Sequence, residues 1–139
     1  MFQHLVPKRL PLSAFERKIS PINGVMDEGL IEEIIIRIVK PATRFCIEFG
    51  AGNGKDNSHV RNLIVNHGFS ALLIEADSRL ATQLKTNYQG DSRVQTAEAF
   101  IYAETIESLF AAHGVPAEPD FLIIDIDGND YHVWKSLVN

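Results

Sequence analysis

Alternating glycines at positions 50, 52 and 54 are the feature that most constrains how this chain can fold. They follow a short apolar run, Phe45–Phe49, and precede a polar stretch and then a helical pattern of apolar residues. Glycine allows a sharp backbone turn, and it allows a ligand to approach where a Cβ would collide. A buried strand, a glycine-rich turn and a helix start, in this order, predict the opening βα unit of a nucleotide-binding α/β domain.

The spacing of the glycines favours one kind of ligand over another. A dinucleotide fingerprint reads Gly-x-Gly-x-x-Gly, whereas this chain has Gly-x-Gly-x-Gly with Glu48 two residues before the first glycine. A ligand with an ammonium and a carboxylate suits the pattern, the amine near Glu48 and the carboxylate at the N-terminus of the following helix. S-adenosylmethionine is such a ligand. The alternative is a glycine turn that only ends a strand.

Composition narrows the class of protein further. The chain has 139 residues, of which 45% are hydrophobic and 22% charged, which predicts one domain with a proper core. Its net charge of −5 provides no basic field for nucleic acid or for an anionic membrane. No apolar run reaches membrane-spanning length and no signal-peptide core is present, so we expect a cytoplasmic protein. The single cysteine, Cys46, is expected to be a buried thiol.

The order of patterns along the chain predicts an α/β fold. Residues 1–22 are expected to form an N-terminal arm and residues 23–139 a single domain, which begins with a helix that Pro41 stops. Four strand-then-helix units follow, with strands at 45–49, 71–74, 94–97 and 121–124. Right-handed crossovers then predict a Rossmann-like parallel sheet in the order 3-2-1-4. A ligand would bind at the carboxyl ends of the strands, beside the switch point between strands 1 and 4.

Acidic residues mark the carboxyl end of every predicted strand. Glu75 lies 21 positions after Gly54, close to the offset at which a carboxylate reaches a ribose in nucleotide-binding βαβ units. The four acidic residues are Glu48, Glu75, Glu98 and Asp125. Because like charges at one rim repel one another, we expect a cationic sulfonium ligand or a metal ion among them.

The run Asp125-Ile-Asp127-Gly128 after the last strand permits three interpretations. It resembles the signature of haloacid-dehalogenase-type phosphatases, but those enzymes carry it early in the chain and need a later lysine and acidic residues for Mg²⁺, whereas only about a dozen residues follow it here. It also resembles the fourth motif of class I methyltransferases, especially the FkbM-type group. In the third interpretation the run is a turn, with Asn129 or Asp127 capping a final helix that buries Trp134 and Leu137.

The methyltransferase resemblance covers residues 23–139 and rests on Glu-Phe-Gly-Ala, Leu-Ile-Glu-Ala-Asp and Ile-Asp-Ile-Asp-Gly-Asn-Asp-Tyr-His-Val-Trp. It implies S-adenosylmethionine as the cofactor and a hydroxyl of a sugar or other small metabolite as the acceptor. The implied cofactor contacts are Glu48, Gly50, Gly52, Gly54, Glu75, Glu98, Ala99 and Asp125, with Glu98 and Ala99 near the adenine. Asp125, Asp127 and His132 are the candidate bases. No metal ligand is assigned, because the chain has no Cys/His cluster.

The resemblance also predicts that residues 23–139 are incomplete as an enzyme, since the family fold continues with three more strands. Strand 4 has no charge or proline to protect an edge, so we expect it to pair with another copy or with a longer polypeptide. Two other function classes stay open: a non-catalytic nucleotide-binding or protein-binding module, and a dinucleotide oxidoreductase, which the glycine spacing disfavours. Among the other histidines, His59 is expected on a helix surface.

Overall fold

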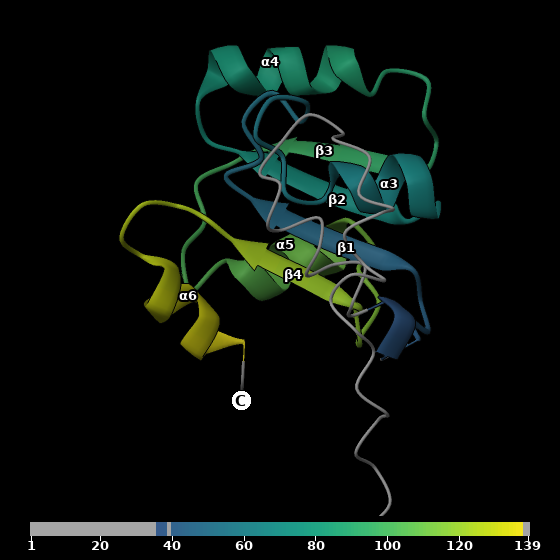
Figure 1. Cartoon of the computed structure of the whole chain (residues 1–139). Helices are drawn as coiled ribbons and strands as arrows, with labels where there is room; N and C mark the ends of the chain where they lie inside the picture. The colour runs from purple at the N-terminus through teal and green to yellow at the C-terminus, as the bar shows by residue number, and fades with distance from the viewer. Residues whose placement is uncertain (1–35, 39, 138–139) are drawn as a thin grey trace, which may run out of the picture.

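The computed structural model describes residues 36–38 and 40–137, and within them strands and helices alternate along the chain (Figure 1). The elements are β1 (Phe45–Phe49), α3 (Arg61–His67), β2 (Ser70–Glu75), α4 (Ser78–Asn87), β3 (Val94–Glu98), α5 (Ile106–Ala112), β4 (Phe121–Ile124) and α6 (Asp130–Ser136). Each strand is followed by a helix, as the apolar patterns predict. The expected arm and most of the expected helix before Pro41 lie outside the described residues, although residues 36–38 are helical.

The strands form one parallel sheet in the order β3-β2-β1-β4. The register places Phe49 opposite Ile74 of β2 on one side and Ile124 of β4 on the other. The predicted α/β fold with the strand order 3-2-1-4 is therefore confirmed, and it is compatible with a Rossmann-like fold. All carboxyl ends of the strands point to the same edge of the sheet (Figure 1), so the residues after them can meet.

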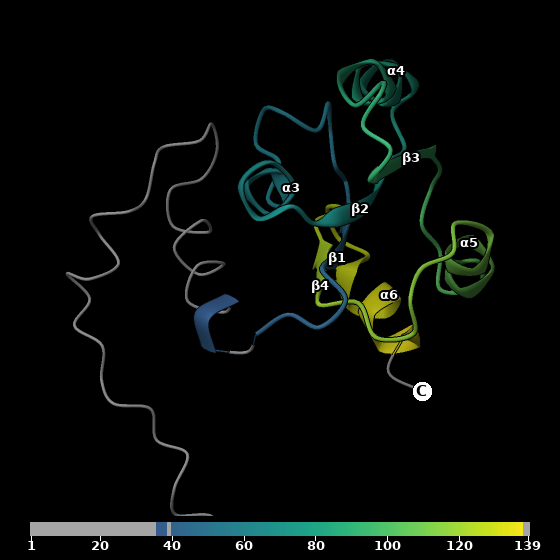
Figure 2. The ribbon, with the colours of Figure 1, turned by 90° about the vertical axis from the view of Figure 1, so that its right-hand side faces the viewer.

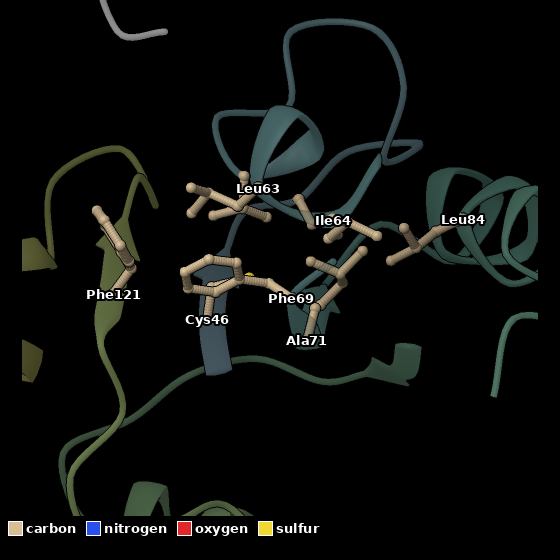
Figure 3. Close-up of a cluster of buried hydrophobic side chains, with 10 residues drawn as sticks. Cys46, Leu63, Ile64, Phe69, Ala71, Leu84 and Phe121 are labelled. Atoms are coloured by element: carbon tan, nitrogen blue, oxygen red, sulfur yellow. The ribbon is translucent and has the colours of Figure 1, made fainter. Parts of the chain in front are cut away.

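Helices cover both faces of the sheet, with α3 and α4 on one face and α5 and α6 on the other (Figure 2). Alternation along β1 sends Cys46 to the first face and Ile47 and Phe49 to the second. The first core contains Leu63 and Ile64 of α3 and Leu84 of α4, together with residues of three strands (Figure 3). Strands buried on both faces explain why β1 and β2 are continuous apolar runs in the sequence.

The last helix differs from its prediction. Trp134 is 54% exposed, whereas Val133 is fully buried and Leu137 packs against the same core. Val133 and Leu137 are four positions apart and so share one face of a helix, while Trp134 is turned about 100° away from Val133. The expectation that Trp134 is buried is therefore wrong for the described part of the chain.

The turn before α6 is also built differently from the prediction. Asn129 occupies the N-cap position without a side-chain hydrogen bond, so the expected cap by Asn129 or Asp127 does not form. The carboxylate of Asp130 instead accepts hydrogen bonds from the backbone N–H groups of Ile126 (3.1 Å) and Gly128 (2.9 Å). These hydrogen bonds hold the pKa of Asp130 below its ordinary value. The turn is therefore fixed from inside the helix.

Among the described residues, no helix has the length and apolar character needed to cross a lipid bilayer.

Candidate functional site

A cavity of about 540 Å³ opens at the carboxyl edge of the sheet, next to the glycine turn. Its volume lies in the range of about 300–1,000 Å³ that is usual for small-molecule sites. The loops after β1, β2, β3 and β4 all contribute to its wall. The lining residues are Gly50, Gly52, Ile74, Glu75, Ala76, Leu80, Ala99, Phe100, Ile101, Tyr102, Asp125, Ile126, Asp127 and Asn129. We call it the first cavity.

A second cavity of about 490 Å³ adjoins the first and shares Gly50, Gly52, Leu80 and Asp125 with it. Its other lining residues are Ala51, Asn53, Asp56, Asn57 and His59. A larger hollow of about 700 Å³ lies between α4 and β3, but none of its lining residues belongs to the glycine turn or to either cavity. The glycine turn, Glu75 and Asp125 therefore lie at the two smaller cavities, which adjoin each other.

Gly50 is needed because β1 and β4 come very close where they end. A Cβ at this position would lie 1.9 Å from the backbone oxygen of Asp125, and the φ angle is +74°. The N–H groups of Gly50 and Ala51 both donate to the carbonyl of Ile74, at 3.0 Å each. The first glycine therefore joins three strand ends.

Gly52 differs from the other two glycines because its open side faces the cavities. A Cβ on Gly52 would have no atom within 4 Å, although its φ of +56° is in the left-handed region. At Gly54, by contrast, a Cβ would lie 2.4 Å from a methyl carbon of Leu84 and 2.6 Å from the ring of Tyr88. Of the three glycines, Gly52 is therefore the one beside which a ligand fits, while Gly50 and Gly54 accommodate other parts of the protein.

Glu75 ends β2 and faces the first cavity. Its Oε2 accepts a hydrogen bond from the backbone N–H of Gly52 at 2.7 Å, and its Oε1 accepts one from Asp77 at 2.8 Å. Asp77 also caps α4 by accepting from the N–H of Leu80, as predicted. Because a carboxylate offers about four acceptor positions, Glu75 can still accept hydrogen bonds from a ligand.

The two candidates after β3 are separated by the structure. Ala99 lines the first cavity, and its N–H donates to the carbonyl of Glu75 at 3.0 Å. Glu98 is exposed and lines the hollow between α4 and β3, where it accepts a hydrogen bond from the hydroxyl of Ser78 at 2.5 Å. The structure thus brings Ala99, but not Glu98, to the cavity that Glu75 lines.

Glu48 is fully buried and lines neither cavity. Its carboxylate accepts hydrogen bonds from the Ser58 hydroxyl (2.8 Å) and the His59 N–H (2.7 Å), just before α3. Burial raises the pKa of Glu48 above its ordinary value, although these hydrogen bonds act in the opposite direction. Glu48 itself therefore occupies the start of α3, which the sequence assigned to the carboxylate of a ligand. Its expected contact with a ligand amine does not fit this arrangement.

Asp125 directly follows β4 and lies on the wall shared by the two cavities. Its Oδ2 is 3.2 Å from Nε2 of His59, and the exposed fractions of the two side chains are 59% for Asp125 and 18% for His59. The expectation that His59 lies on a helix surface is wrong, because α3 begins only at Arg61 and His59 belongs to the preceding bend. The polar run between Gly54 and Val60 is the signal that could have indicated a wide loop here.

The remaining candidate bases lie apart from each other. Asp127 lines the first cavity and has a φ of +53°. His132 is exposed on α6, lines neither cavity, and has its ring centroid 5.5 Å from that of Tyr131. The structure therefore brings Asp125 and Asp127, but not His132, to the cavities.

Two aromatic residues at the rim were not among the sequence candidates. Phe100 and Tyr102 are 69% and 53% exposed, and their ring centroids are 6.4 Å apart. Both line the first cavity, directly after Ala99. The signal available in the sequence is two aromatic residues that flank the buried Ile101 beyond the end of a strand.

The protein itself provides hydrogen-bond partners for the four acidic residues at the strand ends. Each of the four carboxylates has a partner in the protein: Ser58 and His59 for Glu48, two backbone N–H groups for Glu75, Ser78 for Glu98 and His59 for Asp125. Hydrogen-bond donors of the chain itself therefore contact every one of these carboxylates. Residues 36–38 and 40–137 contain no group of three or more His, Cys, Asp or Glu side chains suited to a metal ion.

No protein-family model matches the chain, and a search of curated proteins finds no significant match.

Proposed function

We propose that this chain binds S-adenosylmethionine in the two connected cavities and transfers its methyl group to a hydroxyl of a sugar or other small metabolite. The observation that carries the proposal is the open space beside Gly52, in cavities lined by Glu75 of β2 and by Asp125, the residue after β4. A glycine turn at the switch point of a parallel sheet is where α/β folds bind nucleotides. The acceptor class comes from the resemblance of the motifs.

The residues of the first cavity fit the nucleoside part of this cofactor. Glu75 offers carboxylate oxygens to a ribose and is already held in place by Gly52 and Asp77. Beyond it, Ala99 and Ile101 give apolar contacts for a base, and Phe100 adds an exposed aromatic ring at the rim. When bound, S-adenosylmethionine supplies an electrophilic methyl group on a sulfonium.

The main role of the protein in the proposed reaction is to position the reactants. Methyl transfer between aligned groups needs no covalent bond to the protein, so holding the reacting atoms in line supplies most of the acceleration. Asp125 and Asp127 are the carboxylates of the cavities that could accept the proton of an acceptor hydroxyl. His132 lines neither cavity and is left out of this proposed step.

A non-catalytic nucleotide-binding module is the second candidate. The observation that favours it is the edge position of β4, which pairs only with β1 among the described residues. A site open on that side would have few walls for an acceptor. Such a module would bind the nucleotide without turnover.

Calorimetric titration of the chain with S-adenosylmethionine, S-adenosylhomocysteine and NAD tests the proposal. We expect both sulfur-containing ligands to bind and NAD not to bind. Glu75→Ala should weaken binding, while Glu107→Ala, which removes an exposed carboxylate of α5, serves as the matched control. Binding of NAD alone, or of none of the three ligands, would contradict the proposal. Binding without methyl transfer to any sugar or hydroxyl acceptor would favour the non-catalytic module.

A further inference from the structure

We propose that His59 is a positioning residue, which holds Asp125 so that its carboxylate binds the ammonium group of the methyl donor in the second cavity. This inference rests on the proposed function. It assigns a role to a histidine that the sequence pattern placed on a helix surface. It also replaces Glu48 by Asp125 as the partner of the ligand amine.

The backbones of both residues are anchored to β1. The N–H of His59 donates to the buried carboxylate of Glu48 at 2.7 Å, and the N–H of Asp125 donates to the carbonyl of Phe49 at 3.2 Å. A residue larger than glycine at position 50 would collide with Asp125, so β4 is also held tightly there. The imidazole and the carboxylate therefore meet from two fixed points, although they are 66 residues apart in the sequence.

The contact with His59 restricts the side chain of Asp125, which is largely exposed to solvent and would otherwise be free to rotate. Asp125 is 59% exposed, whereas His59 is only 18% exposed, so the ring is the better fixed of the two. An ionised carboxylate can only accept hydrogen bonds, so Nε2 of His59 is the donor in the 3.2 Å contact with Oδ2. Within the described residues no hydrogen bond reaches Oδ1, which leaves this oxygen for a ligand. Fixing a binding group before the ligand arrives lowers the entropic cost of binding.

The charges around the second cavity favour a cationic group. Asp56 and Asp125 both line it, and none of its lining residues is a lysine or an arginine. Asp56 is itself held by a hydrogen bond from the amide of Asn53 at 2.7 Å. The α-ammonium of the methionine part of S-adenosylmethionine suits these surroundings, whereas the nucleoside suits the first cavity.

Two ligands that differ only in the amino-acid part make the experiment specific. S-adenosylhomocysteine carries the ammonium and carboxylate, and 5′-methylthioadenosine has the same nucleoside and thioether without them. His59→Leu should weaken the binding of S-adenosylhomocysteine to the full chain by roughly tenfold, the loss usual for a charge-assisted hydrogen bond. The binding of 5′-methylthioadenosine should not change. His59→Gln, whose amide nitrogen can replace Nε2 as a donor, should restore most of the affinity.

A second variant guards against an effect on folding. Asp125→Asn removes the charge of an exposed side chain, and we expect the same selective loss for S-adenosylhomocysteine. The double variant His59→Leu/Asp125→Asn should bind S-adenosylhomocysteine as tightly as the single variant that binds it less well, because both substitutions act through one carboxylate.

Additive losses of affinity, equal losses for both ligands or unchanged binding would overturn the inference. Failure of the unaltered chain to bind either ligand would overturn the proposed function and this inference together. Binding of both ligands with equal affinity would overturn the inference alone.

Discussion

The carboxylate of Glu75 holds the backbone N–H of Gly52, with Oε2 and the nitrogen 2.7 Å apart. This hydrogen bond joins the end of β2 to the middle of the glycine turn, 23 residues earlier in the sequence. The two features that point to a nucleotide, the glycines and the acidic residue after the second strand, are thus one structural unit. A change in Glu75 will affect both the ligand and the turn.

The first prediction separates these two effects of Glu75. Glu75→Ala should weaken S-adenosylhomocysteine binding at least tenfold, because a charge-assisted hydrogen bond is worth about 1.5–3 kcal/mol. The protein should stay folded, with a lower free energy of unfolding because the N–H groups of Gly52 and Asp77 lose their acceptor. Calorimetry with S-adenosylhomocysteine and its 2′-deoxy analogue tests the ribose contact. The unaltered chain should prefer the ribose form and Glu75→Ala should not. A preference that survives the substitution would remove Glu75 from the ribose site.

The second prediction compares two glycines of the same turn. Gly50→Ala should destabilise the fold by about 3 kcal/mol or more, since its Cβ would lie 1.9 Å from the Asp125 oxygen in a left-handed conformation. Gly52→Ala meets no neighbouring atom and should cost only about 1–2 kcal/mol for its positive φ. Its methyl group would enter the cavities and weaken ligand binding. Urea unfolding and calorimetry of both variants measure this contrast. Equal destabilisation of the two variants would show that Gly52 is packed against protein.

The third prediction concerns the pH dependence of stability through Glu48. Burial raises its pKa in the folded protein above the ordinary value of 4.5, so the folded state binds the proton more tightly than the unfolded state. Stability from this group is therefore fully present below the unfolded pKa and is lost as the pH rises through the folded pKa. Relative to Glu48→Gln, whose amide can keep the contacts with Ser58 and His59, the unaltered chain should lose stability over that window.

Urea unfolding of both proteins at several pH values between about 4 and 8 measures this difference. Glu107→Gln, which changes an exposed carboxylate, is the control and should show no such trend. The free energy of unfolding of the unaltered chain, relative to that of Glu48→Gln, should fall as the pH rises. A relative stability that stays constant or increases with pH would disprove the raised pKa of Glu48.

The fourth prediction concerns Asp127 and a divalent metal. Asp127→Asn should fold normally, because asparagine tolerates the φ of +53° at this position. Two carboxylates alone rarely hold Mg²⁺ without substrate oxygens or water, so a chelator should leave methyl transfer by the unaltered chain unchanged. Asp127→Asn loses a candidate base, but its remaining activity should likewise be the same with and without the chelator. A methyl-transfer assay with and without EDTA makes the comparison. Turnover that EDTA abolishes and added Mg²⁺ restores would assign a metal role to this turn.

The fifth prediction concerns the edge strand β4. Its outer side has no strand beside it among the described residues, and it contains no charge or proline. We expect the chain to associate through this edge, so sedimentation equilibrium should show a mass that increases with concentration. Amide hydrogen exchange of Phe121–Ile124 should slow down over the same concentration range. A monomer with full turnover and concentration-independent exchange would show that β4 is a tolerated edge.

Sequence patterns alone determined the elements and their order. The runs Phe45–Phe49 and Phe121–Ile124 are strands with the predicted bounds, because burial on both faces requires continuous apolar residues. The sheet order follows from parallel strands and right-handed crossovers, and with it the edge where the glycines, Glu75 and Asp125 meet. These conclusions need only the local periodicity, which is present in a single sequence, and general rules for how strands and helices connect.

Only the tertiary structure decided where the side chains at that edge point. Glu48, Glu75 and Asp125 all mark strand ends, yet Glu48 alternates with Ile47 and Phe49 and so turns into the layer under α3, where Ser58 and His59 bind it. His59 reaches Asp125 because Glu48 of β1 accepts from the His59 N–H, while the Asp125 N–H donates to Phe49 of the same strand. Such contacts depend on distances between segments far apart in the chain. Local patterns do not contain those distances, because packing of the whole sheet and its helices sets them.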